Sequence, residues 1–301
     1  MKPRYVHIGS FNIEHFGRTD DSPNNVFAIS EHIEMSGVGV LALQELYVTD
    51  VSASGELQNS FLDKVAALLR NHTGQEWLYE IFPNRDAGDR SQLCGVLWNA
   101  GRVIRDGAAF RVPVPHDATE GAENFRLWDR APHAVKFRAR PGEDAAVQLT
   151  DFVVVPLHMK SNVGDRHVVM RTRFHEAKGL VDAVPLIAAH FDQEPDIILL
   201  GDTNCKRRDE DAIQAFIDGN YEDLNEDDTP TYYRGSDAPF DRIFVPRGRR
   251  PFSFTRQYIL RSASPLSHDR YLSDHFMVKA SIVVRRDEDT LEQALDEAIN
   301  G

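Results

Sequence analysis

The chain has 301 residues, of which 42% are hydrophobic and 27% are charged, and its formal net charge is −13. No apolar run approaches the ~18 residues of a membrane-spanning helix, and the two cysteines, Cys94 and Cys205, cannot build a disulfide framework, so we expect a cytoplasmic protein without stable membrane association. The acidic balance opposes tight, non-specific binding to polyanions, although acidic residues crowded at one site and in the tail at 287–297 would account for part of it.

The N-terminal third predicts a β-α-β opening followed by a second helix. Apolar runs at residues 6–12 and 38–44 predict two buried strands. Between them, Pro23 stands at the expected start of a helix whose apolar residues recur at helical spacing. The second helix is predicted over residues 57–71, where one face carries Phe61, Leu62, Val65, Leu68 and Leu69.

The middle of the chain is predicted to be mostly β, because runs rich in β-forming residues alternate with turn-forming residues. A long helix follows at 171–191, with Pro185 as a candidate kink. The β-rich runs cover residues 77–82, 93–98, 103–112, 133–138 and 148–157.

The C-terminal third predicts an apolar strand at 197–200, a helix near 209–217 and three closing strands at 241–245, 255–260 and 276–284. The last residues are charged, and Leu291 and Leu295 lie at i,i+4 spacing, which suggests an appended helix. We therefore expect one domain over residues 1–286 and a charged helical tail over 287–301. Mixed strands with flanking helices predict a two-sheet core covered by helices.

Clustered polar residues lie at the ends of six predicted elements, where α/β proteins tend to place their sites. A single Asp or Glu after a strand is more often a turn former or a helix cap, so each cluster alone is weak evidence. Six clusters in one order are stronger evidence. They contain Asn12; Gln44 and Glu45; His158, Lys160 and Ser161; Gly201, Asp202 and Asn204; Asp241 and Arg242; and Ser273, Asp274 and His275.

This order of motifs resembles that of the endonuclease/exonuclease/phosphatase superfamily, and the resemblance runs from the first predicted strand to the last. It implies a four-layer α/β/β/α sandwich with two central mixed, largely antiparallel β-sheets and a site at one end of them. It also implies hydrolysis of phosphodiesters or phosphomonoesters with Mg²⁺ or Mn²⁺.

Two carboxylates are the candidate metal ligands. Glu45 and Asp274 offer hard, anionic oxygen atoms, which favour Mg²⁺ or Mn²⁺ over Zn²⁺. We expect Glu45 to be the first ligand and Asp274 to join directly or through water. Asn12 is expected to orient the Glu45 carboxylate, to join the metal site or to hold a phosphate oxygen. The alternative for Glu45 is a surface residue that follows a strand.

Asp202 and Asn204 flank Gly201, which we interpret as a tight turn after an apolar strand, so both side chains are expected to project into one cleft. In the superfamily that this chain resembles, the aspartate orients or deprotonates the attacking water, and the asparagine contacts the phosphate. The alternative is a pair of caps for the helix predicted near residue 209.

Asp241 and His275 are expected to form a pair. A carboxylate that accepts a proton from imidazole fixes its tautomer and favours the imidazolium form, which stabilises a negatively charged transition state. The alternative is a buried histidine with a structural role only.

The remaining candidates are weaker. In relatives such as pancreatic deoxyribonuclease, a histidine at the position of His158 protonates the leaving oxygen, supported by a glutamate. The nearest counterpart here is Gln92, so His158 is either a general acid or a neutral donor to phosphate. Arg130 has a planar guanidinium that suits a phosphate oxygen. Lys160 and Ser161 are further candidates for phosphate contacts, with exposed surface residues as the alternative.

The function expected from these residues is metal-dependent phosphoester hydrolysis by a monomer, with DNA or RNA as the leading substrate. The alternatives are a phosphatase or phosphodiesterase acting on a small phosphorylated molecule or an inositol phosphate. A sphingomyelinase would usually carry an export signal and an apolar membrane-docking hairpin, and we identify neither pattern in the sequence. An inactive binding module is a further alternative, although such scaffolds lose metal and base residues first.

Overall fold

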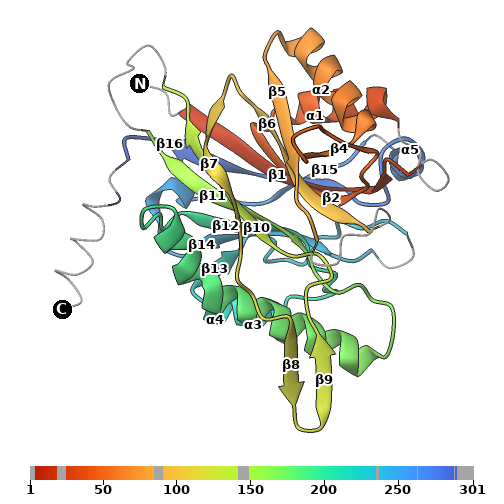
Figure 1. Ribbon diagram of the computed structural model, residues 1–301, viewed down its shortest axis with the longest axis vertical. Coiled ribbons are helices and arrows are strands. Elements are labelled where there is room, and N and C mark those ends of the chain that lie inside the picture. The colour runs from red at the N-terminus through yellow and green to blue at the C-terminus, as the bar shows by residue number, and fades with distance from the viewer. Residues whose placement is uncertain are drawn as a thin grey trace.

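The computed structural model of the protein contains two six-stranded β-sheets that pack face to face (Figure 1). It describes residues 4–18, 25–84, 91–141, 149–234, 237–262, 264–287 and 289. The first sheet has the strand order β15 (Tyr258–Leu260), β16 (Met277–Val284), β1 (Arg4–Phe16), β2 (Val40–Leu46), β6 (Leu93–Asn99) and β5 (Trp77–Ile81). The second has the order β13 (Tyr221–Asp223), β14 (Asp241–Pro246), β12 (Ile197–Asp202), β11 (Asp151–His158), β10 (His133–Ala139) and β7 (Val103–Arg111).

Each sheet contains one parallel pair, β1 with β2 and β11 with β12. The other neighbouring strands of the two sheets run antiparallel. This pairing confirms the prediction of two mixed, largely antiparallel sheets. Two short hairpins lie outside them, β3 (Asp50–Val51) with β4 (Leu57–Gln58) and β8 (Asp117–Glu120) with β9 (Glu123–Arg126).

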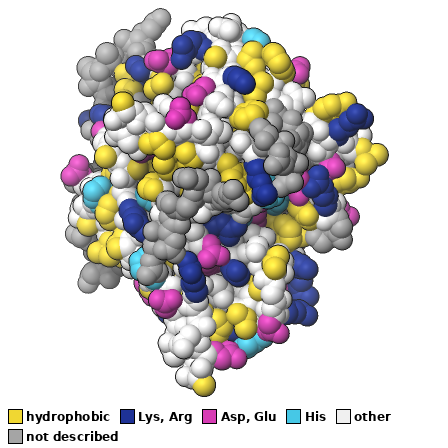
Figure 2. All heavy atoms as spheres, turned by 45° about the vertical axis from the view of Figure 1, so that its right-hand side comes forward, with side chains coloured by type: hydrophobic (Ala, Val, Ile, Leu, Met, Phe, Trp, Pro, Cys, Tyr) yellow, Lys and Arg dark blue, Asp and Glu magenta, His cyan; other side chains and the backbone are white. Residues whose placement is uncertain are grey.

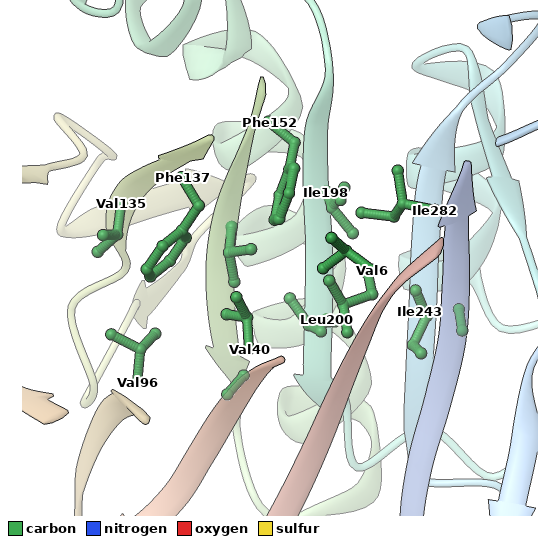
Figure 3. Close-up of a cluster of buried hydrophobic side chains, with 14 of the residues drawn as sticks. Val6, Val40, Val96, Val135, Phe137, Phe152, Ile198, Leu200, Ile243 and Ile282 are labelled. Carbon is green, nitrogen blue, oxygen red and sulfur yellow. The ribbon is translucent and has the colours of Figure 1, made fainter. Parts of the chain in front are cut away.

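The facing surfaces of the two sheets form the central core. Branched aliphatic and aromatic side chains from both sheets interdigitate there (Figure 3). Burying each of them contributes about 1.5–3 kcal/mol relative to exposure, so this layer holds the two sheets in a fixed relation. The labelled side chains are Val6, Val40, Val96 and Ile282 from the first sheet, and Val135, Phe137, Phe152, Ile198, Leu200 and Ile243 from the second.

Helices cover the outer faces (Figure 1). The helices α1 (Val26–Ser36) and α2 (Ser60–Thr73) pack on the first sheet, and α3 (Arg166–His190) and α4 (Asp211–Asp218) pack on the second. These four layers confirm the predicted α/β/β/α sandwich. Two shorter helices precede the last strands, the 3-10 helix η1 (Arg250–Phe252) and α5 (Pro265–Tyr271).

Helix boundaries differ from the predictions because capping residues set them. The helix predicted over 57–71 begins later than expected, since the Asn59 side chain accepts hydrogen bonds from two backbone amides of the first turn. The helix predicted over 171–191 begins earlier, since Asp165 caps it in the same way. Pro185 lies inside that helix.

Two predictions fall on segments outside the described residues. These are the helix start at Pro23 and, apart from Asp287 and Asp289, the tail helix at 287–301. Within the part of the chain that the structure describes, no helix combines the length and the apolar character needed to cross a bilayer.

Candidate active site

Strand order brings the predicted segments to one end of the two sheets. Asn12 of β1 pairs in register with Gln44 of β2. In the second sheet, His158 at the end of β11 lies opposite Asp202 at the end of β12, and Asp202 lies opposite Asp241 at the start of β14. Parallel neighbours end together, and an antiparallel neighbour begins where they end, so side chains distant in sequence gather at one edge.

A pocket of about 450 Å³ lies at this edge. Two further predicted residues, Asn12 and Asp241, are fully buried behind it and form hydrogen bonds with residues of its wall. The geometry therefore brings the main candidates together around one space. The predicted residues that line the pocket are Glu45, Arg130, His158, Ser161, Asp202, Asn204, Asp274 and His275.

Lys160, unlike its neighbour Ser161, does not line the pocket. Its ammonium lies 3.7 Å from a carboxylate oxygen of Asp129. The wall also contains residues that the sequence did not predict. Lys206 had a detectable signal, a cation two residues after Asn204, whereas the others lie in loops whose course is not readable from periodicity. The missed residues are Asn162, Val163, Lys206, Tyr232 and Phe240.

The Asn12 side chain connects the two central carboxylates. Its Nδ2 donates to Glu45 Oε1 at 3.2 Å and to Asp202 Oδ2 at 3.1 Å. Its Oδ1 accepts a hydrogen bond from the Glu14 backbone amide at 3.2 Å. Both ends of this buried amide therefore have partners, and its nitrogen links the two carboxylates.

Two residues of the pocket have left-handed backbone conformations, Glu45 with φ of 62° and Asn204 with φ of 55°. At Glu45, the pairing of β2 with β6 is interrupted by a register shift. Such a bulge re-aims a side chain, and the backbone amide of His15 donates to Glu45 Oε2 at 3.2 Å. Each strained residue costs about 1–3 kcal/mol, and such strain clusters at functional sites.

Gly201 is a strand residue, and the predicted tight turn at this position is wrong. It pairs with Leu157 of β11, and a Cβ atom here would lie 2.0 Å from the Leu157 carbonyl oxygen. The close approach of two strands therefore requires glycine. The chain turns after Asp202, whose Oδ1 accepts from the Asn204 backbone amide at 2.8 Å. Neither residue caps α4, because Glu210 occupies its N-cap position.

Asp202 is buried between two histidines. Its Oδ2 lies 3.7 Å from His158 Nε2 and 3.9 Å from His275 Nε2. Burial, together with the charges of Asp241 and Glu45, raises the pKa of Asp202 to about 6 against the lowering effect of the His275 cation. A carboxylate with this pKa is suited to accept a proton from water near neutral pH.

The predicted pair of Asp241 and His275 is present. His275 Nδ1 lies 2.8 Å from Asp241 Oδ2, which also accepts from the Thr231 hydroxyl at 2.7 Å. Burial opposes a charge on His275, but the carboxylates of Asp241, Asp202 and Asp274 outweigh it and raise its pKa to about 10. Since a carboxylate only accepts, the ring donates from Nδ1 and directs Nε2 toward the pocket side.

His158 lacks the partner expected for a general acid. Within the described part of the chain, its Nδ1 has no hydrogen-bond partner. Gln92 lines the same pocket, but its side-chain oxygen accepts a hydrogen bond from Arg130. Burial, followed by the nearby charge of Arg130, lowers the pKa of His158 well below its usual value. The ring is therefore neutral at neutral pH.

Comparisons with known proteins identify the fold. No protein-family model matches the chain, and no curated protein matches it in sequence. An endonuclease/exonuclease/phosphatase family protein from Bacteroides thetaiotaomicron matches with a TM-score of 0.59 at 15% identity, over 94% of this chain and 99% of that one. The chain has the endonuclease/exonuclease/phosphatase fold.

Two other similar structures of this endonuclease/exonuclease/phosphatase fold are named for different activities. A mannosyl-6-phosphatase from Bacteroides thetaiotaomicron has a TM-score of 0.59 at 14% identity, over 92% of this chain and 99% of that one. D. rerio TDP2, in complex with a single-strand DNA product, has a TM-score of 0.52 at 12% identity, over 93% of this chain and 99% of that one. Proteins with this fold thus differ in their activities.

The donor set of the pocket suits a divalent cation. Glu45 and Asp274 both line it and offer carboxylate oxygens, the ligands that Mg²⁺ prefers. Burial raises the pKa of Asp274, and the negative charge of Glu45 raises it further. A cation between these like charges would relieve their repulsion. Arg234 lies 3.6 Å from Asp274 Oδ2, but its guanidinium is also shared with Asp269 at 2.6 Å.

A second acidic group is present elsewhere. Asp151, Glu194 and Asp289 bring one carboxylate oxygen each within 4.8 Å of one another. The Lys136 ammonium lies 2.8 Å from Asp151 and 3.1 Å from Glu194, so an internal cation already offsets their charge. The pocket at the sheet ends, in contrast, combines the acids with histidines and an asparagine that suit phosphoester chemistry.

Proposed function

We propose that the protein is a divalent-metal-dependent phosphoesterase that hydrolyses phosphodiester bonds of DNA or RNA through in-line attack by water. The observation that carries this proposal is the Asn12 side chain, which holds Glu45 and Asp202 in one arrangement at 3.2 and 3.1 Å. This hydrogen bonding couples the proposed metal ligand to the proposed water-activating carboxylate. Such coupling keeps a nucleophile and a phosphate in fixed relation.

Glu45 and Asp274 are the proposed ligands of Mg²⁺ or Mn²⁺. When bound, the metal supplies Lewis acidity toward a phosphoryl oxygen. The left-handed backbone at Glu45 and the hydrogen bond from the His15 amide fix the direction of one carboxylate. Ser273, the residue before Asp274, donates its hydroxyl hydrogen to the Asn12 backbone carbonyl at 2.7 Å and so links the Asp274 segment to β1.

Asp202 is the proposed residue that orients the attacking water and accepts its proton. With a pKa raised to about 6, the Asp202 carboxylate is still deprotonated at neutral pH and is basic enough to accept a proton. Asn12 and the Asn204 amide each donate to one of its oxygens, which holds the carboxylate in place.

Charge that develops on the phosphoryl oxygens is stabilised by donors around the pocket. We assign this role to the His275 imidazolium, Asn204 and Arg130, which all line it. Asp241 keeps His275 charged and oriented. We assign His158 the role of a neutral hydrogen-bond donor to phosphate. Its lowered pKa means that the imidazolium form, which a general acid requires, is not populated near neutral pH.

Similarity to known structures and surface charge both bear on the substrate. The structure of D. rerio TDP2 with a DNA product favours it. The net charge of −13 opposes broad electrostatic binding, and on the face shown in Figure 2, Lys and Arg side chains are interspersed with Asp, Glu and hydrophobic ones. The similarity to a mannosyl-6-phosphatase supports a second candidate, a phosphatase or phosphodiesterase for a small phosphorylated molecule or an inositol phosphate.

A substrate panel with added Mg²⁺ or Mn²⁺ tests the proposal. It compares single- and double-stranded DNA, RNA, abasic DNA, inositol phosphates and sphingomyelin, with bis-p-nitrophenyl phosphate as the general phosphodiester. Glu45→Ala and Asp202→Ala are each expected to lower turnover at least ~10²-fold, while Glu31→Ala, on the outer helix α1, serves as the matched control. Metal binding without hydrolysis of any phosphoester would instead indicate an inactive binding module.

A further inference from the structure

A second cavity, of about 640 Å³, adjoins the catalytic pocket. The first turns of α3 and α4 and the loop between β12 and α4 form its walls. Asn162 and Lys206 line both cavities, so they stand at the boundary between them. A molecule bound at the catalytic carboxylates can therefore extend past these two residues without crossing the protein core.

The carboxylates that line the second cavity are already paired with arginines. Glu210 lies 3.0 Å from the buried Arg173, and Asp211 lies 3.2 Å from Arg171. These ion pairs offset two of the negative charges in the wall.

The third carboxylate of the wall is paired in the same way. Asp209 accepts a hydrogen bond from Arg207 Nε at 2.7 Å. All three acids of this cavity thus have a guanidinium partner, and the cavity presents less negative charge than its composition suggests.

Two cations of the same wall are left for a ligand. Lys206 and Arg166 are exposed, and no carboxylate among the described residues forms an ion pair with either side chain. Arg166 is the first residue of α3, where the helix dipole adds positive potential. Arg173 adds rigidity, because it donates to the Asn162 side chain at 3.0 Å and so fixes the boundary between the cavities.

We propose that this second cavity binds a second phosphate group of the substrate, next to the phosphoester that is cleaved. The inference rests on the proposed function and narrows its substrate class to molecules that carry at least two phosphates. Lys206 would contact the second phosphate from the boundary, and Arg166 would contact it from α3. The phosphate can belong to the next nucleotide of a strand or to a second position of a small phosphorylated molecule.

Affinity ratios test this inference. Dissociation constants are measured by calorimetry for thymidine 5′-monophosphate and thymidine 3′,5′-bisphosphate, and for inositol 1-phosphate and inositol 1,4-bisphosphate. Ca²⁺ replaces Mg²⁺, and recovery of intact ligand is checked afterwards. The proteins compared are the wild type, the double variant Lys206→Ala/Arg166→Ala, and Lys64→Ala, a lysine of the opposite helix layer.

We expect the wild type and Lys64→Ala to bind the bisphosphate of one pair at least about tenfold more tightly than the monophosphate. In the double variant this ratio falls close to one. The pair that shows the preference identifies the source of the second phosphate. A wild type without preference in either pair, or a double variant that keeps the preference, overturns the inference.

Failure of the proposed function is a separate outcome. Hydrolysis of bis-p-nitrophenyl phosphate, which has a single phosphate, is measured with Mg²⁺ on the same wild-type preparation. A bisphosphate preference without this hydrolysis contradicts the proposed enzyme and supports the second phosphate site. Hydrolysis without the preference supports the enzyme and overturns the site.

Discussion

His275 Nδ1 lies 2.8 Å from Asp241 Oδ2, in a position where both side chains are buried. Asp241 begins β14 of the second sheet, and His275 lies just before β16 of the first sheet. Their contact therefore ties the second sheet to the first at the edge of the pocket. It also sets the charge of the histidine, because the carboxylate compensates for the burial that disfavours imidazolium.

Asp241→Asn should move the alkaline limit of activity toward neutral pH. In the wild type, Asp202 must lose its proton, with a pKa of about 6, and His275 must keep its own, with a pKa of about 10. Activity is therefore expected to rise through pH 6 and to fall near pH 10. Removing the Asp241 charge lowers the pKa of His275, so the descending limb shifts to lower pH and kcat/KM at pH 8 falls at least about tenfold.

The measurement is the pH profile of kcat/KM on bis-p-nitrophenyl phosphate. Asparagine can still accept from His275 and from the Thr231 hydroxyl, so geometry is largely retained while the charge is lost. Asp165→Asn is the matched control, because asparagine caps a helix as well as aspartate does. An unchanged descending limb in Asp241→Asn would contradict the assigned role.

His158→Gln should retain most of the activity, whereas His158→Ala should not. A neutral ring acts through a hydrogen bond, which the glutamine amide can replace and a methyl group cannot. We expect less than about tenfold loss in kcat/KM for glutamine, with an unchanged pH profile. If His158 were a general acid, both variants would lose about 10²–10⁴-fold, so equal losses of that size would refute the neutral role.

The fold could be predicted because its core elements are long and strongly patterned. Continuous apolar runs gave the central strands, and helical spacing gave α1 to α4. The short elements were missed because they lack such a pattern. The β8–β9 hairpin and α5 have few residues and little buried apolar surface, so no periodic signal distinguishes them from loops.

The site could be predicted only where a residue type carries the chemistry itself. Acids and histidines at strand ends were identifiable, and the strand order brings them to one pocket, although their catalytic roles stay predictions. Supporting residues were not identifiable. The Thr231 hydroxyl and the Glu176 carboxylate act through hydrogen bonds to residues outside their own segments, and neither belongs to a motif. Gly201 was misinterpreted, since a glycine after an apolar run fits a turn and a close strand approach equally well.

Gly201→Ala should destabilise the fold strongly. The added Cβ would lie 2.0 Å from the Leu157 carbonyl oxygen, so the central pair β11 and β12 must separate. We expect a loss of at least about 3 kcal/mol in the free energy of unfolding, measured by urea denaturation. Gly39→Ala is the matched control, since its nearest neighbour would lie at an ordinary contact distance of 3.4 Å. Equal stability of the two variants would show that the strands adjust without cost.

Glu176→Gln should weaken catalysis through Arg130, although Glu176 does not line the pocket. Both oxygens of this buried carboxylate accept backbone hydrogen bonds, from Trp128 at 2.8 Å and from Lys160 at 2.9 Å. It therefore joins the loop that carries Arg130 to the loop that follows His158. A glutamine offers one acceptor only, so one of these two amides loses its partner.

A double-mutant cycle separates this positioning effect from general destabilisation. We expect Glu176→Gln to lower kcat/KM about tenfold, and Arg130→Ala to cost less in the Glu176→Gln background than in the wild type, by about 0.5–3 kcal/mol. Unfolding transitions of all variants are recorded alongside. If the two effects add fully, Glu176 does not act through Arg130, and the loss must come from the loop that contains Lys160.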